Sequence, residues 1–284
     1  MATQAASEGD GGSGIMLQRP FRAIRDALCG RSDRPSAPAA ETAAAPRPEG
    51  AEQGAEGLDS RPGASPARPS HPLLDILNNG YGFERSRAER VPVDSKGQPL
   101  PWYTYPAIEY IRQLDLSDKR VFEYGGGSSS RFWAGIAQSV VTVEKNKAWH
   151  DSIRASIPAN VNLLWVPDNP AYERSILAFE PFDVIVIDGS ERYQCAGCAI
   201  ERLKPGGLII LDNSDWYVKA AGRLRAFGLL QVDMTGFGPI NCYTWTTSFF
   251  FHRDFSFRPR GATQPAHGTG SLRQYAAEEA DIEV

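Results

Sequence analysis

One stretch of the chain contains the three parts of a ligand-binding turn in an α/β protein. Residues 120–130 read Arg-Val-Phe-Glu-Tyr-Gly-Gly-Gly-Ser-Ser-Ser, so a β-rich run, an acid and three glycines precede a serine cluster. Serine is a favoured residue at the start of a helix, and glycine lets the backbone approach a ligand closely. The order predicts a strand, a glycine turn and a helix, which is the corner at which parallel sheets bind nucleotides.

The acid in this stretch, Glu123, bears on what the turn would bind. Dinucleotide-binding turns present G-x-G-x-x-G and a positive helix N-terminus to a pyrophosphate. Here Ser130 stands at the third glycine position, and a carboxylate at 123 would repel a pyrophosphate. The same carboxylate would attract the ammonium and sulfonium groups of S-adenosylmethionine, so the stretch favours a methyl donor over NAD.

Strands and helices alternate along the chain after this turn. The predicted strands lie at residues 121–122, 139–143, 161–166, 182–187 and 208–211. Such alternation is the pattern of a parallel sheet covered by helices on both faces. Two further β-rich runs, 229–234 and 243–251, flank a glycine-proline turn and predict an antiparallel hairpin. We expect an α/β fold with a mostly parallel sheet that ends in this hairpin.

Composition divides the 284-residue chain into three parts. Residues 1–70 consist mainly of Ala, Gly, Pro, Ser, Glu and Arg, which predicts a disordered, low-complexity N-terminal extension. Within it, residues 15–28 could form a short basic amphipathic helix with an organelle-targeting role, although acids upstream argue against a standard transit peptide. We expect the folded domain at residues 71–256 and a flexible C-terminal tail at residues 257–284.

Charge and cysteine content exclude some classes of function. The net charge of −4 gives no electrostatic footprint for nucleic acid, so we expect no nucleic-acid partner. No run approaches the length of a transmembrane helix, and four cysteines are too few for a disulfide scaffold, so we expect a cytoplasmic protein without a membrane span. Cys195 and Cys198 form C-x-x-C within a predicted helix, which favours packing over redox or zinc chemistry.

An acidic residue stands at or just past the end of each predicted parallel strand. In chain order these are Glu123, Glu144, Asp168, Asp188 and Asp212, the last followed by Asn213. Ligands bind outside the carboxyl ends of the strands in open α/β sheets, so the acids are expected to face one site. The alternative is that each acid only stabilises the start of the helix that follows it.

Each of the first three acids fits one part of a nucleoside-containing donor. Glu144 lies nineteen residues after Gly125, the position at which an acid binds both hydroxyls of a ribose. Asp168 could accept a hydrogen bond from an adenine amino group. Glu123 and the backbone around Gly125 would hold the amino-acid portion.

Four motifs, in this order, resemble class I S-adenosylmethionine-dependent methyltransferases. They are Glu123-Tyr-Gly-Gly-Gly-Ser, Val143-Glu144, Phe182-Asp-Val-Ile-Val-Ile-Asp188-Gly and Leu203-Lys-Pro-Gly-Gly-Leu-Ile-Ile-Leu-Asp212-Asn213. The resemblance covers roughly residues 100–255 and implies a Rossmann-like, seven-stranded sheet and S-adenosyl-L-methionine as cofactor. The residues expected to contact this cofactor are Glu123, Tyr124, Gly125, Gly126, Gly127, Ser128, Glu144, Asp168 and Asp188.

The acids after the fourth and fifth strands resemble a metal site. Asp188, Asp212 and Asn213 match the ligands of small-molecule O-methyltransferases of the catechol and caffeoyl-coenzyme A types. By this resemblance they would hold Mg²⁺, which would bind an acceptor hydroxyl and lower its pKa before in-line attack on the methyl group. Gly189 and the lack of a residue matching that family's catalytic lysine depart from the pattern. Without metal, Asp188 or His150 would be the general base.

Aromatic residues near the predicted cleft are candidates for the substrate-binding surface, with core packing as the alternative. They are Tyr103, Tyr105, Tyr193 and Trp216. We expect a methyltransferase that acts on an oxygen of a small-molecule acceptor, such as a sugar or a phenol. Three alternatives remain. One is a different enzyme of this fold, such as an aminopropyl transferase, although the sequence shows no second acidic cluster for a polyamine. The others are a protein or RNA methyltransferase recruited through the N-terminal extension, and a non-catalytic module that binds the donor.

Overall fold

A computed structural model describes residues 72–272 of the chain. The predicted N-terminal extension, with its amphipathic segment at residues 15–28, lies outside the described residues, as do residues 273–284. Among residues 72–272, no helix has both the length and the apolar character needed to cross a membrane.

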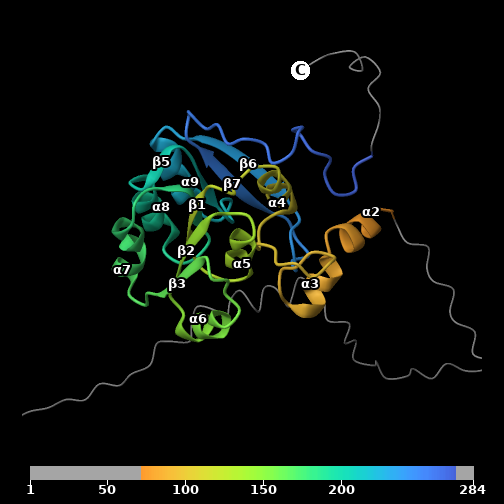
Figure 1. Ribbon diagram of the computed structural model, residues 1–284, viewed down its shortest axis with the longest axis horizontal. Coiled ribbons are helices and arrows are strands. Elements are labelled where there is room, and N and C mark those ends of the chain that lie inside the picture. Colours follow the sequence, from red (N-terminus) through yellow and green to blue (C-terminus); the bar gives the residue numbers. More distant parts are fainter. Residues whose placement is uncertain (1–71, 273–284) are drawn as a thin grey trace, which may run out of the picture. The chain divides into compact units, whose positions relative to one another are not determined.

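Seven strands form a single sheet in the order β3-β2-β1-β4-β5-β7-β6 (Figure 1). The strands are β1 (Arg120–Tyr124), β2 (Ser139–Glu144), β3 (Val161–Trp165), β4 (Phe182–Ile187), β5 (Leu203–Leu211), β6 (Leu230–Gly236) and β7 (Trp245–Phe251). β1 to β5 pair in parallel, whereas β7 is antiparallel to both β5 and β6. The sheet confirms the predicted Rossmann-like architecture, including the C-terminal antiparallel pair.

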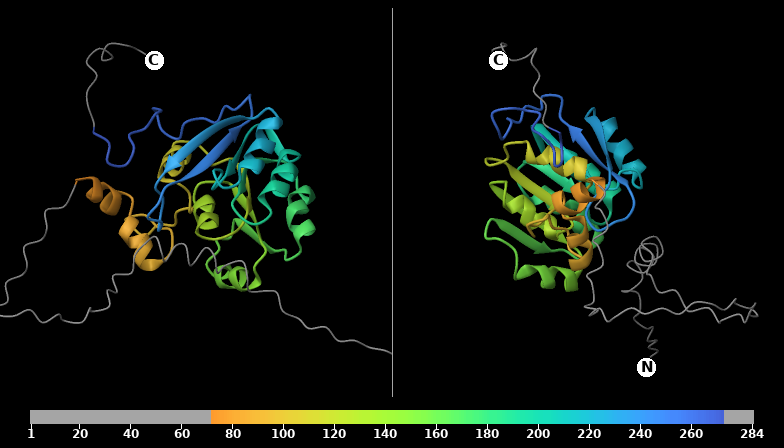
Figure 2. Two further views of the ribbon diagram at one scale, coloured as in Figure 1. Left: turned by 180° about the vertical axis from the view of Figure 1, so that it is seen from behind. Right: turned by 90° about the vertical axis from the view of Figure 1, so that its right-hand side faces the viewer.

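Helices cover both faces of the sheet, as the sequence predicted (Figure 2). One face packs against α4 (Tyr105–Arg112) and α5 (Ser128–Ala134). The other face packs against α7 (Asn169–Arg174), the 3₁₀ turn η2 (Ser175–Ala178), α8 (Arg192–Ile200) and α9 (Val218–Ala226), while α6 (Lys147–Arg154) contacts β2 and β3. The runs 184–187 of β4 and 208–211 of β5 are apolar and buried. Because neighbouring residues of a strand point to opposite faces, both faces of the sheet are covered at these strands.

In the segment before the sheet, the apolar residues Leu73, Leu74, Ile76 and Leu77 predict a first helix, which the structure has as α2 (Pro72–Asp75) and the π-helical turn η1 (Ile76–Gly80). The next helix, α3 (Phe83–Glu89), was not predicted. The loop that follows is anchored on the hairpin, because Thr104 N donates to Thr247 Oγ1 at 3.1 Å and Thr104 Oγ1 donates to Met234 O at 2.7 Å. This loop therefore lies beside the carboxyl end of β5, next to the predicted site.

Residues 255–270 pack along the domain, in contrast to the flexible tail that their composition predicts from residue 257 (Figure 1, blue). The amide of Asp115 donates to Arg258 O at 2.8 Å, and the amide of Thr269 donates to Glu109 Oε1 at 3.1 Å. Phe255 and Phe257 pack against the core, with ring centroids 4.6 Å apart. Backbone hydrogen bonds and two aromatic rings hold a segment whose composition is otherwise that of a loop.

Replacing Phe257 by alanine tests this packing. We expect Phe257→Ala to lower the free energy of unfolding by about 1–2 kcal/mol, because a partly buried ring loses its contacts with Phe255 and the Lys119 ammonium. The matched control is Phe227→Ala, whose ring is mostly exposed and should change stability by less than about 0.5 kcal/mol. Urea denaturation of the full chain measures both, and equal effects would show that the segment does not pack.

Candidate functional site

The loops that follow β1 and β4 touch one another at two glycines. Gly125 has φ +91°, and a Cβ on it would lie 2.7 Å from the Cα of Gly189. A Cβ on Gly189 would in turn collide with the Tyr172 hydroxyl and lie 2.9 Å from Gly125 N. Gly189, which departs from the metal-dependent pattern, is thus required by this close approach. The strand order also reverses at this point, which is where open α/β sheets bind ligands.

Glu123 is a fully buried carboxylate at the end of β1. Its Oε2 accepts hydrogen bonds from Ser130 Oγ at 2.5 Å and Thr142 Oγ1 at 2.9 Å. Its Oε1, also buried, has no hydrogen-bond partner among residues 72–272. Burial raises the pKa of Glu123 to about 7, against the lowering effect of the Ser129, Ser130 and Thr142 hydroxyls. A buried acceptor without a partner is costly, so this oxygen is a candidate for contact with a ligand.

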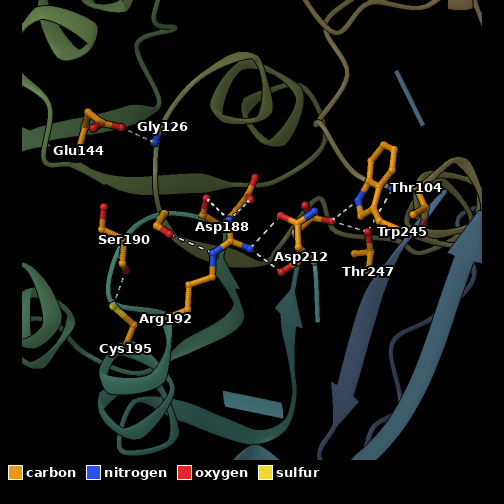
Figure 3. Close-up of polar contacts among 12 residues, drawn as sticks. Thr104, Gly126, Glu144, Asp188, Ser190, Arg192, Cys195, Asp212, Trp245 and Thr247 are labelled. Atoms are coloured by element: carbon orange, nitrogen blue, oxygen red, sulfur yellow. Dashed lines mark hydrogen bonds and ion pairs between the residues drawn. The ribbon is translucent and has the colours of Figure 1, made fainter. Parts of the chain in front are cut away.

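Glu144, at the end of β2, points toward the glycine turn. Its Oε2 accepts from Gly126 N at 3.2 Å, and its Oε1 accepts from Asn146 N at 2.7 Å (Figure 3). Burial raises its pKa, although these backbone hydrogen bonds act in the opposite direction. Each carboxylate oxygen can accept a further hydrogen bond, as binding of two ribose hydroxyls requires.

The glycine turn is bordered by a tryptophan that the sequence analysis did not select. Trp149 Nε1 donates to Gly126 O at 2.7 Å, and the indole is 48% exposed. A Cβ on Gly127 would lie 3.6 Å from the Trp149 ring, so the indole runs along the turn. Ser128, predicted to contact the cofactor, donates from Oγ to Pro92 O at 2.9 Å and so ties the turn to the segment before the sheet.

Two residues of the predicted cofactor set have other roles in the structure. Asp168 is exposed and caps α7, because its carboxylate accepts from Ala171 N at 3.1 Å. Tyr124 is buried in the core, where its hydroxyl donates to Glu173 O at 2.7 Å, so only its backbone belongs to the glycine turn. For Asp168, the contacts therefore agree with the alternative that the acid stabilises the start of the helix that follows it.

The three predicted metal ligands lie together, but an arginine lies among them (Figure 3). Arg192 Nη2 donates to Asp188 Oδ1 at 3.0 Å, and Nη1 donates to Asn213 Oδ1 at 3.2 Å. Nη1 also donates to the backbone carbonyl of Asp212. The guanidinium is 8% exposed, whereas the Asp188 side chain is 19% exposed. Asp188 is thus the carboxylate of this group that solvent or a ligand can reach.

Asp212 is held on its other side by the C-terminal hairpin. Its Oδ1 accepts from Trp245 Nε1 at 3.0 Å and from Thr247 Oγ1 at 2.6 Å (Figure 3). Burial raises the pKa of Asp212 to about 6. Burial likewise raises the pKa of Asp188 well above its ordinary value, the nearby charge of Asp212 adds to the rise, and Arg192 opposes it.

These contacts do not fit the Mg²⁺ site expected from the sequence. Arg192 uses Asp188 Oδ1 and Asn213 Oδ1, and Trp245 and Thr247 use Asp212 Oδ1. No group of three or more His, Cys, Asp or Glu side chains within residues 72–272 is arranged to hold a metal ion. The three residues meet, and a guanidinium donates to the side chains of Asp188 and Asn213 and to the backbone carbonyl of Asp212. Arg192 stands four residues after Asp188, at the first position of α8, a spacing that the sequence shows.

Two predicted residues lie away from this group. His150 belongs to α6, which contacts β2 and β3, and its Nδ1 lies 3.0 Å from Asp151 Oδ1. Tyr193 is 48% exposed, and the Arg223 guanidinium of α9 lies 4.8 Å from its ring centroid. The structure does not bring either side chain together with Asp188.

The other aromatic candidates divide between the site and the core. Tyr103 is fully buried, and its hydroxyl accepts from Trp133 Nε1 at 3.4 Å. Burial raises the pKa of Tyr103, and the charges of Glu123, Asp188 and Asp212 add to the rise. Tyr105 stacks on Tyr81 at 4.2 Å within the core cluster, so its ring has the packing role.

Trp216 lies near the hairpin at the rim of the group. Its ring centroid is 6.3 Å from that of Tyr243, which is 6.1 Å from that of Trp245. Trp245 donates to Asp212, so the three rings lead from the half-exposed Trp216 to the buried carboxylate. This position is compatible with substrate contact.

Comparison with known proteins finds solved structures that resemble this chain at low sequence identity and low TM-score. No family model and no curated protein sequence matches the chain. A precorrin-6y C5,15-methyltransferase from Geobacter metallireducens matches with 16% identity over 51% of this chain and 87% of that chain, at a TM-score of 0.40. A putative caffeoyl-CoA O-methyltransferase from Staphylococcus aureus matches with 15% identity over 63% and 91%, at 0.43. The Methanococcus jannaschii fibrillarin pre-rRNA processing protein matches with 18% identity over 54% and 76%, at 0.41.

These similarities are too low to carry an argument about activity. The fold is defined by the sheet itself, whose strand order and antiparallel hairpin make the protein Rossmann-like. The candidate site is defined by the buried acids at the carboxyl ends of β1 and β5 and by the partly exposed Asp188 after β4.

The pH dependence of stability tests the burial of Glu123. A carboxyl whose pKa rises from 4.5 to about 7 on folding binds protons more tightly in the folded chain, so its contribution to stability falls as pH rises through that window. The free energy of unfolding of Glu123→Gln relative to that of wild type should therefore increase from low to high pH, by on the order of 2–3 kcal/mol between about pH 4.5 and about pH 8. Chemical denaturation at about pH 4.5 and about pH 8 measures the difference.

The matched control for this experiment is Glu201→Gln, since Glu201 is exposed. Its stability difference from wild type should be the same at both pH values. A difference between Glu123→Gln and wild type that does not change with pH would show that Glu123 is not buried in the folded protein.

Proposed function

We propose that this protein is an S-adenosyl-L-methionine-dependent methyltransferase that methylates a hydroxyl group of a small molecule. The observation that carries the proposal is Glu123 Oε1, a buried carboxylate oxygen without a partner among the described residues, beside a glycine turn at the point where the strand order reverses. A cationic group of a ligand would satisfy this oxygen. The resemblance of the four sequence motifs to class I methyltransferases supports the same assignment.

The residues around the glycine turn fit the parts of the donor. Glu144 is positioned to accept hydrogen bonds from ribose hydroxyls, and Glu123 Oε1 to accept one from the amino group. Gly126 leaves no room for a side chain, because a Cβ on it would lie 2.8 Å from Thr142 Cγ2. When bound, the donor supplies a methyl group on a positively charged sulfur, an electrophile for an oxygen nucleophile.

The balance of charge also favours a cationic ligand over an anionic one. After burial, the charges of Asp212 and Glu123 raise the pKa of Asp188, and the Arg192 guanidinium opposes them. Two buried carboxylates and the partly exposed Asp188 against one guanidinium leave excess negative charge when ionised, which would stabilise an ammonium or sulfonium and repel a pyrophosphate.

Asp188 is the proposed general base at the acceptor end. It is the reachable carboxylate, and its raised pKa brings it closer to the range in which a base can take a hydroxyl proton at neutral pH. The chain before α4 and the loop between β6 and β7 meet beside the acceptor end. Tyr105 N, at the start of α4, donates to Phe237 O, just after β6, at 2.7 Å. Such a bordered site favours a small acceptor, with Tyr103 and Trp216 as proposed contacts.

The proposal includes a cytoplasmic location. Cys195 and Cys198 are both thiols, although they stand three residues apart on α8, and Cys195 is fully buried in the core. This use of cysteine is typical of proteins in reducing compartments.

Donor binding is tested by calorimetric titration with S-adenosylhomocysteine. We expect wild type to bind it, and Glu144→Ala to bind about 10- to 100-fold more weakly, because the ribose would lose two hydrogen bonds to a charged group. Glu201→Ala, at an exposed acid away from the turn, should bind as wild type does. Binding of NAD in place of S-adenosylhomocysteine would contradict the proposal.

Methyl transfer is tested with donor labelled in the methyl group and a panel of phenols and sugars. We expect Asp188→Asn to lower kcat by about 10²- to 10⁴-fold, since the amide cannot take the hydroxyl proton. Its S-adenosylhomocysteine affinity should stay within about threefold of wild type, which would place the loss in the transfer step.

His150→Ala is the matched control for Asp188→Asn, and should retain the wild-type kcat because its ring faces Asp151 on α6. Loss of transfer in His150→Ala with full activity in Asp188→Asn would overturn the assignment of the base. Label found only in protein or RNA, and lost on deletion of residues 1–70, would support the alternative of a recruited macromolecular methyltransferase.

A further inference from the structure

We propose that the Arg192 guanidinium is the resident cation of the acceptor end, so that the Asp188–Asp212–Asn213 group is held by an arginine and does not bind a divalent metal ion. In this arrangement Arg192 is a positioning residue for Asp188. The part of the inference that concerns the acceptor rests on the proposed function; the part that concerns metal binding does not.

The guanidinium joins the loops that follow β4 and β5. Arg192 Nη2 donates to Asp188 at both the backbone carbonyl and Oδ1, each at 3.0 Å, and Nε donates to Gly189 O at 3.0 Å. On the β5 side, Nη1 donates to Asn213 Oδ1 and to the Asp212 carbonyl. One side chain therefore fixes two neighbouring loops and one oxygen of the Asp188 carboxylate.

An aromatic ring supports the guanidinium from one face. The Arg192 Cζ lies 4.4 Å from the ring centroid of Tyr217, a distance at which cation and ring attract one another. With the ring on its face and five hydrogen bonds along its edge, the guanidinium has little freedom to leave. The planar fork of arginine suits this geometry, whereas the point charge of lysine would not reproduce it.

A divalent ion held by all three residues would have to share the Asn213 amide oxygen with Arg192 and lie beside the guanidinium charge. Asp188 Oδ1 and Asn213 Oδ1 both accept from Arg192, and Asp212 Oδ1 accepts from Trp245 and Thr247. Displacing Arg192 would leave a buried, permanently charged group without its anionic partner, which is a large energetic cost. The arginine thus supplies, as part of the chain, the positive charge that an ion would bring to these carboxylates.

Arg192 can position Asp188 because it binds only one of the two carboxylate oxygens. Arg192 fixes Asp188 at Oδ1 and at its backbone carbonyl, while the side chain keeps 19% of its surface exposed. The carboxylate is thereby oriented without being covered. Arg192 itself is nearly buried and is not placed to contact reacting atoms, so its influence on transfer acts through Asp188.

Binding of Mn²⁺, followed by electron paramagnetic resonance on the full chain, tests the inference. We expect wild type to show no saturable binding at millimolar Mn²⁺, and Arg192→Ala to gain a site at least about tenfold tighter, because two acids and an amide would be left without their cation. The gain should disappear in Arg192→Ala combined with Asp188→Asn. A purely structural role for Arg192 would not create a metal site.

Arg223→Ala is the matched control. Arg223 also lies over a tyrosine ring and donates to a backbone carbonyl, but it does not contact the acids of the site. It should bind Mn²⁺ no better than wild type. If Arg192→Ala does not fold, Arg192→Gln serves in its place, since an amide removes the charge and keeps a donor for Asp188.

Saturable Mn²⁺ binding by wild type that is lost in Asp188→Asn would overturn the inference, and so would failure of both folded Arg192 variants to gain a site. Titration with S-adenosylhomocysteine in the presence of a chelator separates this result from the proposed function. Absence of donor binding together with the expected Mn²⁺ pattern would refute the proposed methyltransferase and leave the arginine assignment intact.

Discussion

The contact between Gly125 and Gly189 is the constraint on which the site depends. It brings the backbone after β1 against the backbone after β4 at the point where the strand order reverses, and neither position has space for a Cβ. The amide of Asp188 donates to Tyr124 O, so the acid after β4 is held beside the acid in β1. A larger residue at either glycine would separate the two loops and, with them, the carboxylates that the sheet brings together.

This geometry concentrates acids at a cost in stability. Glu123 and Asp212 are buried, and burial raises the pKa values of both and of Asp188. The surrounding hydroxyls, the Trp245 indole and Arg192 offset part of the desolvation, but Glu123 Oε1 keeps no partner among the described residues. Shifted pKa values and unsatisfied polar atoms cluster at functional sites, where a ligand supplies the missing interaction.

The sheet was predictable from the sequence because its signal is periodic and local. Five apolar runs separated by helices, followed by two runs around a glycine-proline turn, specify parallel strands and a terminal hairpin without knowledge of long-range contacts. The packing of residues 255–270 was not predictable in this way, because it depends on the Glu109 side chain of α4 and on backbone groups of Gln113 and Asp115, which composition does not reveal. Helix α3 was missed because its polar face dominates its short sequence.

The acids of the site were predictable by position, but their partners were not. A carboxylate at the end of a strand can bind a ligand, cap a helix or pair with a cation, and the choice depends on side chains from other elements. Asp168 caps α7 because the helix begins at the next residue, and this position can be recognised from the local sequence. Asp212 is fixed by Trp245 and Thr247 of the hairpin, more than thirty residues away.

The arginine shows how one residue changes the chemistry that a motif implies. Asp188 followed by Asp212-Asn213 is a pattern for metal ligands only if the space between them is open to an ion. Arg192 stands four residues after Asp188, across the loop that joins β4 to α8, and its side chain returns to the carboxyl end of β4. Two solutions then exist for the same electrostatic problem: a diffusible ion whose occupancy depends on its concentration, or a guanidinium that is always present. The contacts of Arg192 favour the second, so identity at ligand positions alone does not establish metal dependence in this fold.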